Sequence, residues 1–199
     1  MKKILLAGEG PNVLGRWARE PAFRKDYGAG VIEALLRKIR PEGWVVCGGV
    51  SWRSIRKYKI GEHRNAEIRN VMGLVLKARE QGCDGVAFVR DRDGSRAKPN
   101  KQRAESIEDG IAQAQQKWRE CPAIIGGVAI KRLESWLVAL LREDGSEDMS
   151  NPEEYLEACD VIPKNTESYV ALINSADLDG VPGDAESLAR WLDRARKLL

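Results

Sequence analysis

Hydrophobic residues gather in four short runs, and between and after them apolar positions recur every three or four residues. Short continuous apolar runs are typical of buried strands, and the wider spacing is typical of helices. The runs predict strands over residues 4–7, 44–47, 86–89 and 123–128. The spaced segments predict helices over residues 29–40, 64–80, 103–118 and 131–142, and helical pieces near 152–158, 166–174 and 184–198.

Strands that alternate with helices form right-handed βαβ units with parallel strands. The order of elements therefore predicts an α/β fold: a mostly parallel four-stranded sheet flanked by helices, with a C-terminal helical cap. We expect one α/β domain over residues 1–145 and an acidic helical extension over residues 146–199 that packs on the same domain.

Charge is unevenly distributed along the chain, although 33 Lys and Arg nearly balance 30 Asp and Glu. Residues 1–103 hold 23 basic and 11 acidic side chains, a net +12, and residues 104–199 hold 10 and 19, a net −9. The basic half predicts a surface that faces a polyanion. No apolar run approaches the ~20 residues that span a bilayer. The N-terminal apolar run is too short for a signal peptide, so we expect a cytoplasmic protein.

The cysteines do not have the spacing of a metal site. Cys47, Cys83, Cys121 and Cys159 are far apart in the sequence, and the only histidine is His63. Since Cys47 and Cys83 lie in or beside apolar runs, we expect buried, reduced thiols.

Acidic residues follow two of the predicted strands, at the ends where an open parallel sheet binds its ligands. Glu9 follows the first strand, between two glycines that allow a sharp turn. Asp91 and Asp93 follow the third strand, and residues two apart on extended backbone point to the same side. Because two adjacent carboxylates repel, the pattern predicts a bound Mg²⁺ (or Mn²⁺) ion. The alternative is a solvated turn with neighbouring arginines as counter-ions.

Glu134 lies on or beside the apolar face of the predicted helix 131–142. A carboxylate in that position is costly unless it is paired or bound to a metal. Glu134 is therefore a further candidate catalytic residue, and the alternative is a border residue paired with Lys131 or Arg132.

Cations alternate with aromatic residues directly after the second strand, and more cations follow the Asp91–Asp93 turn. Lys and Arg contact phosphates and aromatic rings stack on bases, so these residues are candidates for nucleic-acid binding. The candidates are Trp52, Arg53, Arg56, Lys57, Lys59, Arg96 and Lys98. Ordinary solvated loops are the alternative for both segments.

The order of two motifs resembles TOPRIM, the metal-binding domain of topoisomerases, primases and OLD-type nucleases. In this sequence the first strand is followed by Glu9-Gly10, and a later strand ends in Asp91-Arg92-Asp93. Residues 134–137, Glu-Ser-Trp-Leu, resemble the E-x-W-L helix of a TOPRIM-related bacterial family linked to phage defence. The resemblance covers residues 3–142. It implies Glu9 as general base or metal ligand, Asp91 and Asp93 as Mg²⁺ ligands, and Glu134 as a further ligand or neighbour. Val13 stands where OLD-type members often carry another acid, which weakens any second metal site.

We therefore expect a Mg²⁺-dependent nuclease or related phosphoryl-transfer protein in bacterial anti-phage defence, with DNA favoured over RNA as the nucleic acid. The resemblance implies a separate ATPase subunit as a partner. Whether the chain also forms a homo-oligomer is left open by the sequence. One alternative is a non-catalytic TOPRIM-like binding or scaffold subunit of a larger complex. A second is a phosphatase of the haloacid-dehalogenase type, because residues 91–95 resemble its D-x-D-G-[ST] loop, with Asp91 as the nucleophile.

Overall fold

The structure is a computed structural model that describes residues 1–18, 28–58, 65–92, 94, 95, 98, 99, 101–158 and 163–199. Its centre is a four-stranded sheet in the order β2-β1-β3-β6, and every neighbouring pair is parallel. The strands are β1 (Lys2–Gly8), β2 (Trp44–Ser51), β3 (Gly85–Asp91) and β6 (Ala123–Ala129). The four predicted strands and the parallel α/β fold are confirmed.

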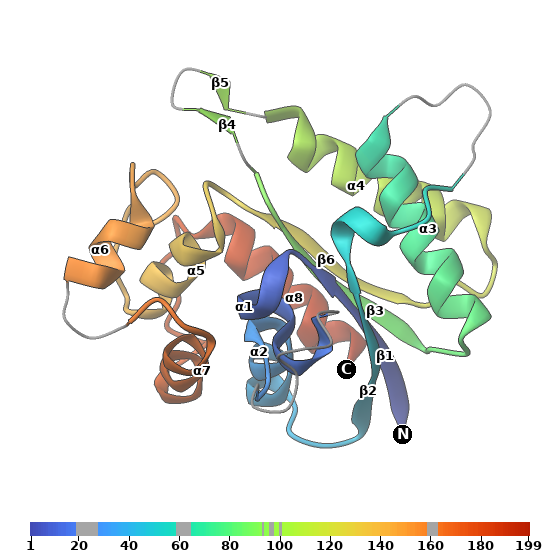
Figure 1. Ribbon diagram of the computed structural model, residues 1–199, viewed down its shortest axis with the longest axis horizontal. Helices are drawn as coiled ribbons and strands as arrows, with labels where there is room; N and C mark the ends of the chain where they lie inside the picture. Colours follow the sequence, from blue (N-terminus) through green and yellow to red (C-terminus); the bar gives the residue numbers. More distant parts are fainter. Residues whose placement is uncertain (19–27, 59–64, 93, 96–97, 100, 159–162) are drawn as a thin grey trace.

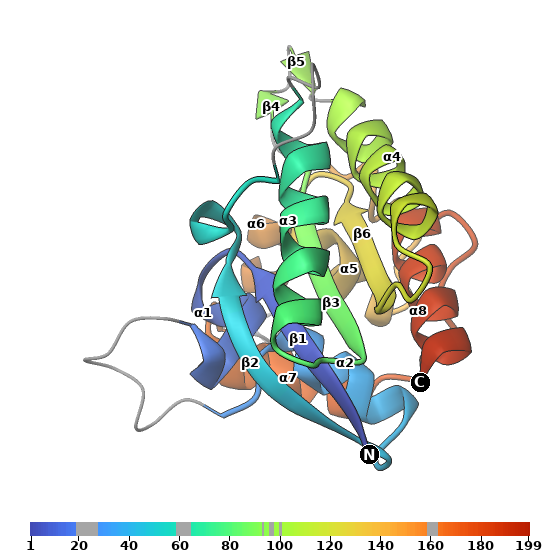
Figure 2. The ribbon, with the colours of Figure 1, turned by 90° about the vertical axis from the view of Figure 1, so that its right-hand side faces the viewer.

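Helices cover both faces of the sheet, so its central strands are buried on both sides (Figures 1 and 2). Successive residues of β1 show this arrangement, because Leu5 belongs to one hydrophobic core and Leu6 to the other. This two-sided burial explains why the strands read as continuous apolar runs. The Leu5 face packs against α3 (Ala66–Glu80) and α4 (Lys101–Lys117). The Leu6 face packs against α1 (Gly10–Leu14), α2 (Val31–Ile39), α5 (Leu133–Leu140) and α7 (Thr166–Ser175).

The C-terminal helices share a core with the sheet. Side chains of α7 and α8 (Glu186–Leu198) belong to the same hydrophobic cluster as Leu6, and α6 (Pro152–Ala158) contributes Leu156. α8 runs beside the edge strand β6 (Figure 2). Its Trp191 indole N–H donates to the Phe88 carbonyl at 3.1 Å, and Arg194 donates to the Gly126 carbonyl at 2.6 Å. In the described part of the chain, no helix is long and apolar enough to cross a bilayer.

Several short elements were not predicted, because they are too brief to show a period. They are η1 (Gly15–Trp17), η3 (Trp52–Ser54), α1 and the hairpin of β4 (Gly94–Ser95) and β5 (Lys98–Pro99). The hairpin projects beyond the carboxyl end of β3, toward the start of α4 (Figure 1). α1 begins with a glycine and a proline, so its five residues lack the pattern of an amphipathic helix.

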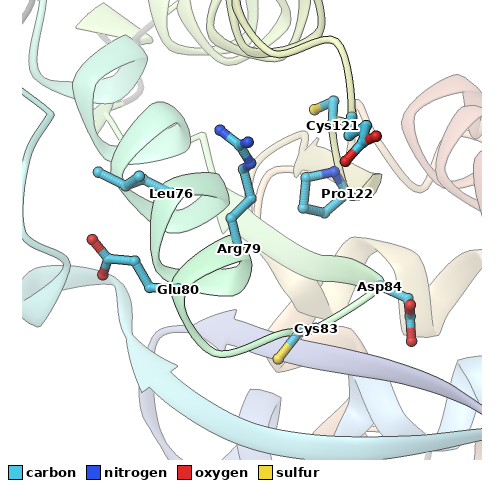
Figure 3. A pocket seen from close by; sticks show the side chains of 8 residues that line it. Leu76, Arg79, Glu80, Cys83, Asp84, Cys121 and Pro122 are labelled. Atoms are coloured by element: carbon cyan, nitrogen blue, oxygen red, sulfur yellow. The ribbon is translucent and has the colours of Figure 1, made fainter.

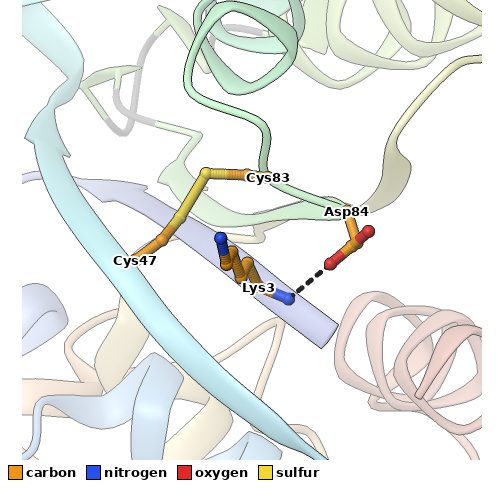
Figure 4. Close-up of a disulfide and its surroundings, with 4 residues drawn as sticks. All are labelled: Lys3, Cys47, Cys83 and Asp84. Atoms are coloured by element: carbon orange, nitrogen blue, oxygen red, sulfur yellow. Dashed lines mark hydrogen bonds between the residues drawn. A yellow bond between two sulfur atoms is a disulfide. The ribbon is translucent and has the colours of Figure 1, made fainter. Parts of the chain in front are cut away.

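A disulfide joins Cys47 of β2 to Cys83, just before β3, and crosses over β1 (Figure 4). Cys47 is the extra residue of a β-bulge, because Ile4 pairs with Val46 and Leu5 pairs with Gly48. The prediction of reduced thiols is therefore wrong for Cys47 and Cys83. Strand order brings the two residues together across the intervening strand, and the sequence spacing does not show this.

Candidate functional site at the carboxyl ends of the strands

The acidic residues Glu9 and Asp91 lie at the carboxyl ends of the two central strands. Glu9 directly follows β1 and Asp91 is the last residue of β3, and these strands are hydrogen-bonded neighbours with Ala7 opposite Phe88. From β1 the chain proceeds to β2 on one side of the sheet, and β3 then lies on the other side of β1. Such a reversal of strand order is where open α/β sheets bind ligands.

Two glycines fix the turn that carries Glu9. A Cβ on Gly8 would lie 2.3 Å from Val13 Cγ1, so only glycine fits there. Gly10 has φ 78°, a left-handed conformation that glycine adopts without strain. The Glu9 side chain lies at the surface with 29% of its area exposed.

Arg90, one residue before Asp91, places a buried cation between two carboxylates. Its side chain is 6% exposed and forms ion pairs with Glu9 and Glu67. Arg103 from α4 also pairs with Glu67, with Nε 3.0 Å from Oε1. The Trp52 indole N–H donates to the second Glu67 oxygen at 2.9 Å, and the Arg90 guanidinium lies over the Trp52 ring. Two guanidiniums and two carboxylates thus form a network at the ends of β1 and β3, with Arg90 buried at its centre and Glu9 at its exposed edge.

Asp91 holds the start of α5. Its Oδ1 accepts a hydrogen bond from the Leu133 backbone N–H at 2.9 Å, and its carbonyl accepts one from Arg103 at 2.8 Å. Lys131, between β6 and α5, has φ 71°, which is strained for a residue with a side chain. A non-glycine residue held in this region is often found at functional sites.

Glu134 is 9% exposed and accepts a hydrogen bond from the Tyr169 hydroxyl of α7 at 3.3 Å. Burial and the neighbouring Glu134 carboxylate raise the pKa of Tyr169, so this hydroxyl stays protonated and remains a donor at neutral pH. Asp91 and Glu134 are linked through the start of α5, because Asp91 accepts a hydrogen bond from the Leu133 N–H and Glu134 is the next residue. The prediction of a buried or bordering Glu134 on this helix is confirmed, with tyrosine as a partner that sequence reasoning missed.

The candidate nucleic-acid residues differ in their exposure. Arg53, Arg56 and Lys57 are exposed after β2 and are available for phosphate contacts. The prediction that Trp52 stacks on a base is wrong, because Trp52 is 2% exposed and lies in the core against Phe88. Trp52 instead supports the Glu67 carboxylate.

The remaining candidates fall outside what the structure describes in full. Asp93, Lys59 and Arg96 lie outside the described residues, as does His63. Lys98 is described only as backbone of β5.

The oxygen donors at this end of the sheet are of the type that Mg²⁺ prefers. In residues 1–18, 28–58, 65–92 and the later described segments, no three acidic, cysteine or histidine side chains gather as a metal would need. Glu9 and Asp91 supply two of the three predicted ligands, on neighbouring strands, while Glu9 is neutralised by Arg90. The carboxylate oxygens of Glu9 and Asp91 fit Mg²⁺ as ligands, provided that Glu9 leaves Arg90 to bind the ion.

A hollow at the opposite end of the sheet does not suit a polyanion. This cleft of about 610 Å³ lies beside the start of β3 (Figure 3). The cleft is lined by one cation, Arg79, and three acids, Glu80, Asp84 and Glu120. Burial raises the pKa of Cys121, the thiol that lines the cleft, so it is not an activated nucleophile.

Comparisons of the chain with protein-family models, curated proteins and solved structures find no match.

Proposed function

We propose that this protein is a Mg²⁺-dependent nuclease, or a related phosphoryl-transfer enzyme, acting on nucleic acid at the carboxyl ends of β1 and β3. The carrying observation is that Glu9 and Asp91 follow the two neighbouring central strands at the point where strand order reverses. We further propose a cytoplasmic role in bacterial anti-phage defence, with DNA as the favoured substrate and a separate ATPase subunit as partner. The defence role and the ATPase partner follow from the resemblance to TOPRIM and TOPRIM-related proteins.

Each group at the site has a role in this proposal. Glu9 and Asp91, together with Asp93, would hold Mg²⁺ or Mn²⁺, which polarises a phosphodiester and activates water when bound. Glu134 on α5 would be a further acid, oriented by Tyr169, and it immediately follows Leu133, whose backbone N–H donates to Asp91. The role of Glu9 in this site requires the carboxylate to leave Arg90.

Exposed cations next to the acids support a nucleic-acid substrate. Arg53, Arg56 and Lys57 extend from the carboxyl end of β2, the strand beside β1. Cations in such a position neutralise backbone phosphates and release counter-ions, so nucleic-acid affinity would fall steeply with rising salt.

The test is cleavage of labelled single-stranded DNA, duplex DNA and RNA by purified protein with Mg²⁺, Mn²⁺ or EDTA. We expect cleavage with a divalent ion, none with EDTA, and a loss of at least about a hundredfold in Asp91→Asn. Glu42→Gln is the matched control, because Glu42 is exposed before β2, at the opposite end of the sheet. Cleavage that is equal in wild type and Asp91→Asn would refute the proposal.

A non-catalytic binding subunit is the second candidate, and the Arg90 network favours it. Arg90 pairs with both Glu9 and Glu67, so the Glu9 carboxylate is neutralised without a metal. Nucleic-acid binding that is unaffected by EDTA, with no cleavage of any substrate, would support this candidate over the enzyme.

A further inference from the structure

Arg90 is a buried cation whose hydrogen-bonding capacity is only partly used. Its Nη2 donates to Glu67 at 3.1 Å and its Nη1 forms an ion pair with Glu9, whereas Nε has no acceptor among the described residues. A buried donor without an acceptor is unfavourable, so Arg90 could gain from a ligand that also reaches Nε.

The two carboxylates around Arg90 are held very differently. Glu67 is fixed, because it accepts hydrogen bonds from Trp52 and Arg90 and pairs with Arg103. Glu9 is more exposed, at 29% of its side chain, and its partners are Arg90 and, at 4.0 Å, the exposed Arg53. Glu9 is therefore the partner that can leave.

We propose that the Glu9 carboxylate occupies an anion site that receives a backbone phosphate of the nucleic acid. Arg90 forms the floor of this site and Arg53 its rim, and Glu9 swings out when the phosphate enters. The inference rests on the proposed function only for the identity of the ligand.

A phosphate can use a donor of Arg90 that the protein leaves unmatched, because the buried Nε has no acceptor among the described residues. A guanidinium also binds phosphate oxygens through several N–H groups, which the contact with Glu9 does not provide.

The Glu9 side chain already reaches solvent, with 29% of its area exposed, so it can turn outward without crossing the core. In the resting protein Glu9 would thus keep the buried arginine neutral, and would compete with any anion for it.

The test is binding of a fluorescein-labelled single-stranded oligodeoxynucleotide, followed by anisotropy in EDTA, so that no divalent ion takes part. We expect Glu9→Gln to bind about tenfold more tightly than wild type, because a competing charge a few ångströms from the phosphate is removed. Glu42→Gln should bind like wild type. Adding Arg53→Gln to Glu9→Gln should reverse part of the gain, and since Arg53 is 90% exposed this change leaves the fold intact.

Competition experiments identify the anion that occupies the site. A dinucleotide phosphodiester should displace the probe from Glu9→Gln at lower concentration than inorganic phosphate, because it reproduces the backbone of the nucleic acid. Preferential displacement by inorganic phosphate would overturn the phosphodiester assignment.

The inference and the proposed function can fail separately. Unchanged or weaker binding by Glu9→Gln would overturn the anion site, even if the wild type cleaves DNA. Tighter binding by Glu9→Gln, in a protein that cleaves nothing, would support the anion site and refute the nuclease.

Discussion

Glu67→Gln should destabilise the protein far more than Glu9→Gln, although both changes remove one charge beside Arg90. Glu67 is 16% exposed, accepts two hydrogen bonds and pairs with Arg103. A charge-assisted hydrogen bond contributes about 1.5–3 kcal/mol, and breaking a buried pair costs about 3–5 kcal/mol. Because glutamine retains one acceptor oxygen, we expect a loss of about 3 kcal/mol for Glu67→Gln. Glu9 is 29% exposed, and Arg90 keeps Glu67 as a partner when Glu9 is replaced, so the loss for Glu9→Gln should stay below about 1 kcal/mol.

Urea unfolding followed by tryptophan fluorescence measures both losses, with Glu42→Gln as the surface control. For a chain of 199 residues, each kcal/mol lowers the melting temperature by about 2–4 °C. Glu67→Gln should therefore melt about 9 °C below wild type in a thermal scan. Equal losses for Glu67→Gln and Glu9→Gln would refute the reasoning, because Glu9 would then be a structural partner of Arg90 and not an exchangeable occupant of its site.

Two further predictions concern other parts of the fold. Cys47→Ser should lower the free energy of unfolding by about 4 kcal/mol in non-reducing buffer, because the bridge to Cys83 spans 36 residues. Dithiothreitol should remove this difference between the variant and wild type. A wild type that dithiothreitol does not destabilise would contradict the prediction. Burial raises the pKa of Glu147, so the folded state binds this proton more tightly than the unfolded state. Wild type should consequently gain stability relative to Glu147→Gln as pH falls from neutral through the raised pKa. Thermal scans of both proteins at several pH values test this. A difference in melting temperature that stays constant with pH would contradict the prediction.

The sequence predicted the strands well, because a parallel sheet buried on both faces leaves a local signal. Each strand reads as an apolar run of four or more residues, and the glycine-flanked Glu9 marked the end of the first. The positions of Glu9 and Asp91 then followed from the general rule that strand ends in such sheets carry the ligand site.

Contacts between distant segments could not be predicted in the same way. Trp52 looked like an exposed stacking residue because cations surround it, but its ring packs against Phe88 of β3. Glu67 stands in the first turn of α3, where acids are common for local reasons, so nothing marked it as the partner of Arg90. Arg90 did carry a signal: a charged residue at the end of an apolar run must be paired if it is buried.

The two edges of the sheet are protected from pairing with another chain. An unpaired edge strand offers free N–H and C=O groups to any passing strand, which promotes aggregation. α8 closes the β6 edge, where Arg194 already uses the Gly126 carbonyl. β2 carries a bulge at Cys47, and Gly49 lies so close to Trp17 that an added Cβ would be 2.5 Å from the tryptophan Cβ. The bulge that positions the disulfide therefore also distorts the open edge, which disfavours pairing with a strand of another chain.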